Sequence, residues 1–174
     1  MSTNEFARPI RLDVLGPGPR DFDFAAGVEE RTALARRFAL VSIDRLEVTA
    51  AVRREGPGAY AEGRVAAEVV QSCVATDVPI PARIDVPFTL RFVPEGAEAV
   101  GDEVELSEDD CDTVEFTGSA IDLGEAAAET LVLSLDPFPR AAGADAVLRE
   151  AGVLEEGEAG PFAALKALKD KLGE

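Results

Sequence analysis

The chain has 174 residues, 47% of them hydrophobic, and 34 acidic residues against 17 lysines and arginines give it a formal net charge of −17. This length suits one domain over residues 1–174, and the hydrophobic content excludes a chain that is disordered throughout. No apolar run approaches the roughly 20 residues of a membrane helix, and the first residues lack a signal-peptide pattern, so we expect a cytoplasmic protein.

The first half of the chain predicts strands around one helix. Alternating apolar residues at 10–14 and 22–24 indicate two short strands. Residues 28–38 have a helical pattern, with acids in the first turn and arginines in the last. The predicted core face of this helix consists of Val28, Leu34, Ala35 and Phe38. Apolar residues occur at every second position in two segments, residues 42–54 and 60–74, which lie on either side of a Gly-Pro-Gly turn. This pattern predicts an antiparallel hairpin.

The middle of the chain combines a strand with an acidic segment. Pro79 and Pro81 place their neighbours in a loop or at a sheet edge, because proline has no N–H to donate to another strand. The next strand is predicted at 85–93. The acid- and glycine-rich stretch at about 95–112 predicts a flexible loop, with a short strand at 104–106.

A strand around Val114 and Phe116 then leads into a helix with an acidic side. At 100° per residue, Asp122, Glu125 and Glu129 fall on the same side of its first two turns. Asp122 is suited to cap the helix N-terminus, because Glu125 follows at the spacing of a capping box.

The last part of the chain is less regular. Apolar residues at 131, 133 and 135 favour a half-buried strand directly after the helix. A weakly structured segment at about 140–160 and an amphipathic helix at 161–172 follow. Together the patterns predict an α+β fold, with an antiparallel, strongly bent sheet and a few covering helices including a C-terminal one. The sheet either stays open or closes into a barrel-like form.

Common catalytic and metal-binding motifs are missing from the sequence. The chain has no histidine, and neither Cys73 nor Cys111 belongs to a C-x-x-C pair, since Thr76 stands where the partner of Cys73 would be. The acidic residues do not follow the calcium-loop pattern, and no phosphate-binding loop is present. We therefore predict that the protein is not an enzyme and needs no metal or other cofactor.

The excess negative charge belongs to the second half of the chain. Residues 1–92 hold 12 arginines against 13 acids, whereas residues 93–174 hold 5 basic residues against 21 acids. Such a surface repels nucleic acid and attracts a basic protein, so direct RNA binding is disfavoured. The predicted partner contacts are Asp122, Glu125, Glu129, Asp109, Asp110 and Asp112. The alternative is an RNA-binding module that uses Arg36, Arg37, Arg53 and Arg54.

Several short motifs carry a family resemblance. They are Gln71-Ser72-Cys73, Ile121-Asp122-Leu123-Gly124-Glu125, Leu135-Asp136-Pro137-Phe138-Pro139 and Pro161-Phe162-Ala163-Ala164-Leu165. In their order and spacing, over roughly residues 40–172, they resemble the bacterial YceD family, a domain of formerly unknown function. The resemblance implies a role in accumulation of the large-subunit ribosomal RNA, and the family's gene commonly lies beside that of a small basic ribosomal protein. The hypothesis is a non-enzymatic accessory factor of ribosome biogenesis that binds a basic ribosomal protein of the large subunit or a precursor particle.

Overall fold

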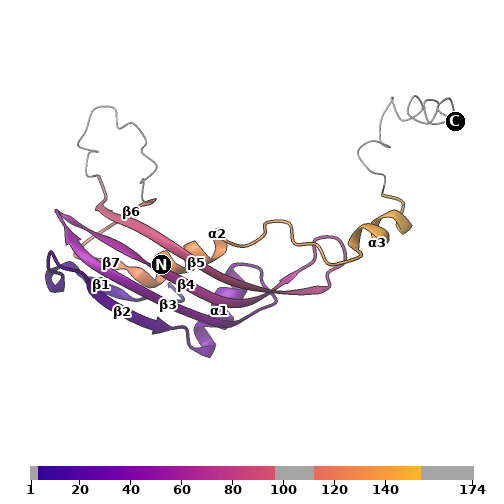
Figure 1. Ribbon diagram of the computed structural model, residues 1–174, viewed down its shortest axis with the longest axis horizontal. Coiled ribbons are helices and arrows are strands. Elements are labelled where there is room, and N and C mark those ends of the chain that lie inside the picture. Colours follow the sequence, from indigo (N-terminus) through magenta and orange to yellow (C-terminus); the bar gives the residue numbers. More distant parts are fainter. Residues whose placement is uncertain (1–3, 97–111, 154–174) are drawn as a thin grey trace, which may run out of the picture. The chain divides into compact units, whose positions relative to one another are not determined.

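The computed structural model describes residues 4–96 and 112–153, which fall into two compact units. The first unit contains residues 4–71, 81–96 and 112–137, and the second contains residues 72–80 and 138–153. Strands and helices both occur in the first unit, so the predicted α+β class is confirmed (Figure 1).

Five strands form the main sheet in the order β2-β3-β4-β5-β6. Their bounds are Arg20–Ala25 (β2), Ser42–Glu55 (β3), Gly58–Ser72 (β4), Pro79–Pro94 (β5) and Asp112–Phe116 (β6). A separate two-stranded sheet pairs β1 (Pro9–Arg11) with β7 (Ala120–Asp122). The helices are the 3-10 helix η1 (Leu12–Val14), α1 (Val28–Arg37), α2 (Leu123–Leu133) and, in the second unit, α3 (Ala144–Glu150).

The main sheet is mixed and open. β3 pairs antiparallel with both β2 and β4, as the hairpin pattern predicts, whereas β6 pairs parallel with residues 90–94 of β5. The fully antiparallel prediction is therefore wrong at β6, where the connection after β5 is long enough to bring the chain back to the same end of the sheet. Among the described strands, β2 and β6 are the two edges and do not pair with each other, so the sheet does not close into a barrel.

The predicted strand at 131–135 is wrong, because α2 continues to Leu133. In a strand, Leu131 and Leu133 would share a face. In the helix, Leu131 is buried and Leu133 is 82% exposed. The alanines at 126–128 have the highest helix propensity and are buried in the core, which favours the helix over the period-two pattern that follows.

Other differences are local. The strand predicted at 10–14 is shorter, since β1 ends at Arg11 and η1 follows. β5 already begins at Pro79, and both prolines lie where β5 is an edge, because β6 pairs only with residues 90–94. Val28, predicted to face the core, is 70% exposed at the first position of α1.

Two predicted elements, the strand at 104–106 and the helix at 161–172, lie outside the described residues. The segment predicted to be weakly structured at about 140–160 contains α3. None of the helices in the described part of the chain is both long and apolar enough to cross a membrane.

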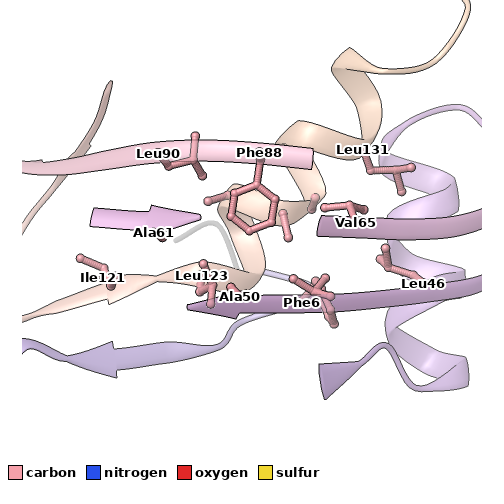
Figure 2. Close-up of a cluster of buried hydrophobic side chains, with 14 of the residues drawn as sticks. Phe6, Leu46, Ala50, Ala61, Val65, Phe88, Leu90, Ile121, Leu123 and Leu131 are labelled. Atoms are coloured by element: carbon pink, nitrogen blue, oxygen red, sulfur yellow. The ribbon is translucent and has the colours of Figure 1, made fainter. Parts of the chain in front are cut away.

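The core lies on one face of the main sheet (Figure 2). Inward-facing residues of β3, β4 and β5 pack there with Phe6, with Leu34 of α1 and with Leu123 and Leu131 of α2. Gly63 of β4 leaves room for this packing, because a Cβ at that position would lie 2.7 Å from Cζ of Phe88. The alternate residues of the same strands form the opposite face, which we call the outer face. In the described part of the first unit, no helix packs on it.

Candidate functional site

The start of α2 is the most densely hydrogen-bonded part of the predicted site. Asp122 is its N-cap, and Oδ1 of Asp122 accepts hydrogen bonds from the backbone N–H groups of Gly124 and Glu125, both at 3.1 Å. The same oxygen accepts from the backbone N–H of Arg8 at 2.9 Å, and Oδ2 accepts from the side-chain amide of Asn4 at 2.6 Å. The carboxylate therefore joins the N-terminal segment to α2.

Replacing Asp122 should destabilise the fold. Asp122→Ala removes a helix cap and leaves the N–H of Arg8 without its acceptor, so we expect a loss of about 2–3 kcal/mol of unfolding free energy. Urea denaturation followed by circular dichroism measures this loss. The matched control is Glu129→Ala on the exposed side of the same helix, which should change stability by about 0.5 kcal/mol or less. Equal effects of the two substitutions would contradict the structural role of Asp122.

Glu125 is also engaged within the fold. Its carboxylate forms a two-pronged ion pair with the guanidinium of Arg37 at the end of α1, in which Nη1 of Arg37 lies 3.0 Å from Oε2 of Glu125. Arg37 bonds Glu5 as well, at 3.1 Å. The hydrogen bond that Arg37 donates to Glu125, with the negative charges of Glu125 and Glu5, raises the pKa of Arg37 above its ordinary value. This ion pair connects α1, α2 and the N-terminal segment.

The other predicted acidic contacts are distributed differently. Glu129 and Asp112 are exposed, on α2 and at the start of β6. Asp109 and Asp110 lie outside the described residues. Among the described residues, the structure places Asp112 on a different element from the three acids of α2, and it gives Asp122 and Glu125 internal partners. Their role in partner binding stays a prediction.

The arginines of the RNA-binding alternative are mostly held by contacts within the fold. Arg37 pairs with Glu125, and Arg53 lies 3.4 Å from Glu55 and stacks on the ring of Tyr60, with its Cζ 3.8 Å from the ring centroid. Arg54 donates to the carbonyl of Leu12 at 2.9 Å and to that of Gly56 at 3.0 Å.

Arg36 differs from the other three arginines. Its side chain is exposed and forms no hydrogen bond or ion pair with any described residue. It lines a hollow of about 430 Å³ between α1 and the start of β3, together with Arg31 and Asp44. Of the four predicted RNA contacts, Arg36 alone presents a guanidinium that is not engaged within the described part of the chain.

The outer face of the main sheet has a larger hollow, of about 650 Å³, which crosses β2 to β5. Three carboxylates line it, those of Asp21, Asp23 and Glu62, and small side chains such as Ala51 form its floor. Asp21 and Glu62 lie on either side of Ala51 in the strand register. No lysine or arginine lines this hollow, and none of the three acids forms an ion pair with a described residue. We call it the acidic hollow.

Sequence reasoning missed the acidic hollow. The alternation with Phe22 and Phe24 indicates only that Asp21 and Asp23 are the polar residues of a short strand, and no sequence pattern singles out Glu62. The two-residue turn between Glu55 and Gly58 fixes Glu62 beside Ala51, so this part of the hollow could have been found. The pairing of β2 with β3 could not have been predicted, because α1 separates the two strands in the sequence.

Cys73 belongs to the second unit and is buried there as a free thiol. Its sulfur accepts a hydrogen bond from the backbone N–H of Ala141 at 3.3 Å. This bond is the main cause that lowers the pKa of the thiol to about 7. The described residues contain no group of three or more acidic or cysteine side chains arranged to hold a metal ion.

Comparison with known proteins assigns a family. The family model described as "Large ribosomal RNA subunit accumulation protein YceD" matches residues 61–169. The chain belongs to the YceD family. The match includes most of β4 and all of β5 and α2, and thus the Asp122 cap, Glu125 and Glu62, whereas β2 with Asp21 and Asp23 precedes it. Comparisons with curated proteins and with solved structures found no match. Membership in the YceD family implies a role in accumulation of the large-subunit ribosomal RNA, as an accessory factor of ribosome biogenesis.

Proposed function

We propose that this YceD protein is a non-enzymatic factor of large-subunit biogenesis that binds a basic ribosomal protein, free or within a precursor particle. The observation that carries the proposal is the acidic hollow, where three carboxylates face the same space without a guanidinium among them. Charge of this kind speeds the encounter with a cationic protein and adds specificity.

The distribution of ion pairs also favours a protein partner over RNA. On the outer face, Arg64 pairs with Asp85 and Arg91 with Glu55, so these guanidiniums are already engaged by carboxylates. Binding to an RNA backbone depends on cationic side chains that are available to neutralise phosphates. The surplus on this face is negative, which suits lysine and arginine side chains of a partner.

The proposal moves the expected contact from α2 to the outer face. Asp122 and Glu125 stabilise the fold, so reversing their charge would perturb folding as well as binding. Asp21, Asp23 and Glu62 are exposed and can be changed without removing a described hydrogen bond between side chains. The acids of the 97–111 segment, including Asp109 and Asp110, stay candidate secondary contacts.

Affinity purification from a bacterial lysate at physiological salt, with mass spectrometry, tests the proposal. Wild-type protein should recover basic large-subunit ribosomal proteins, and Asp21→Lys/Asp23→Lys/Glu62→Lys should recover about ten-fold less. Two further variants measure how much the other acidic residues contribute to this recovery. They are Asp112→Lys/Glu129→Lys and Asp109→Lys/Asp110→Lys. If the wild type recovers no ribosomal protein or precursor particle, the proposal is wrong.

A second experiment, direct binding of the purified protein to RNA, tests the RNA-binding alternative. A purified fragment of the large ribosomal RNA should show no binding at physiological salt. Binding that is lost in Arg36→Glu but unchanged in the acidic-hollow variant would instead support RNA recognition. Arg37→Glu is unsuitable for this purpose, because it breaks the ion pair with Glu125.

A further inference from the structure

The free edge of β2 has a regular pattern of main-chain groups. The N–H of Ala26 donates to the carbonyl of Leu46 at 2.9 Å, which continues the β2–β3 ladder. Hydrogen-bonded positions alternate along an antiparallel pair, so the N–H and C=O groups of Phe22 and Phe24 point toward β3. Those of Asp21 and Asp23 therefore point away from the sheet.

These outward groups have no partner in the described part of the chain. Nη2 of Arg8 donates to the carbonyl of Ala25 at 3.2 Å, which closes the edge at that end. The main-chain groups of Asp21 and Asp23 form no such bond with any described residue. An unpaired row of this kind is a template for another strand.

The side chains of β2 restrict which strand can bind. The carboxylates of Asp21 and Asp23 lie on the outer face, and the half-buried rings of Phe22 and Phe24 lie on the core face. A second copy of β2 would place carboxylate opposite carboxylate, which is unfavourable. A strand with lysine or arginine at alternate positions places positive charge opposite both acids and leaves its other side chains next to the two rings.

We infer that the edge of β2 binds an extended, cationic segment of a partner protein by strand addition, with basic residues at alternate positions opposite Asp21 and Asp23. This inference rests on the proposed function for the class of partner and adds the mode of binding. Main-chain hydrogen bonds supply affinity, and the two carboxylates supply selectivity. The adjacent acidic hollow accommodates the ends of long basic side chains.

Amide exchange measured by NMR on the full chain tests this mode of binding. The probe is a capped heptapeptide of alternating lysine and valine. It should slow the exchange of the Asp21 and Asp23 amides by about ten-fold or more and leave those of Phe22 and Phe24 unchanged, because the latter already bond β3. A fully N-methylated peptide keeps the charge, but its methyl groups replace the N–H donors and keep the two strands too far apart to pair, so it should slow neither amide.

Protein variants separate charge from main-chain pairing. Asp21→Asn/Asp23→Asn should weaken peptide binding about five-fold, whereas Glu29→Gln/Glu129→Gln, which removes two exposed acids elsewhere, should not. Equal binding of the methylated peptide, or unchanged exchange at Asp21 and Asp23, would overturn strand addition. Such a result combined with recovery of ribosomal proteins would leave the proposed function intact. Slower exchange of the Asp21 and Asp23 amides, without recovery of ribosomal proteins from the lysate, would overturn the proposed function. It would still support strand addition at the edge of β2.

Discussion

Leu131→Ala should destabilise the protein by about 2–5 kcal/mol, whereas Leu133→Ala should change its stability by about 0.5 kcal/mol or less. Both leucines belong to α2 and are two residues apart. Leu131 is fully buried against the core cluster (Figure 2), so its truncation leaves a cavity. Leu133 is 82% exposed. Urea denaturation followed by circular dichroism measures both effects.

This pair also distinguishes the helix from the strand that the sequence favours. In a strand the two leucines would lie on one face and their truncation would have similar effects. Two large losses would therefore show that α2 ends earlier than Leu133. An unchanged dependence of the unfolding free energy on urea concentration would show that neither variant alters the extent of folding.

Gly124→Ala is expected to destabilise the protein by about 1–3 kcal/mol, although alanine is the better helix former by about 1 kcal/mol. A Cβ at Gly124 would lie 1.8 Å from the carbonyl oxygen of Phe6 and 3.0 Å from the backbone nitrogen of Arg8. These are main-chain atoms, and Phe6 is itself fully buried, so neither can move without disturbing the core. Thermal or urea unfolding measures the loss.

Gly18→Ala is the control for this substitution. Nothing lies within 4 Å of a Cβ at Gly18, and its change in stability should stay within about 0.5 kcal/mol. If Gly124→Ala is as stable as the wild type, the N-terminal segment does not pass over α2 at the distance that the structure gives.

Local patterns were sufficient to predict the elements that repeat a simple period. α1, β2 and the β3–β4 hairpin each follow from hydrophobic spacing and turn residues within about 15 positions. The end of α2 could not be predicted in this way, because the apolar residues at 131, 133 and 135 fit the two-residue period of a strand. Only the position of the core decides between this period and that of a helix.

The role of the acidic side of α2 depended on contacts between distant parts of the chain. The sequence correctly places Asp122 at a helix cap, but its bonds to Asn4 and Arg8 join residues more than 100 positions apart. The pairing of Glu125 with Arg37 spans 88 positions. No local pattern contains these partners, which is why the acidic side was interpreted as a surface and not as a junction.

The pairing of β1 with β7 has a consequence for how the chain is made. Arg8 and Asp122 are 114 positions apart, so the first strand stays without a partner until most of the polypeptide has been synthesised. Contacts of such long sequence separation slow folding. Until α2 has been synthesised, the part of the core that Phe6 shares with Leu123 and Leu131 cannot form, so the last step of core formation awaits the emergence of α2 from the exit tunnel.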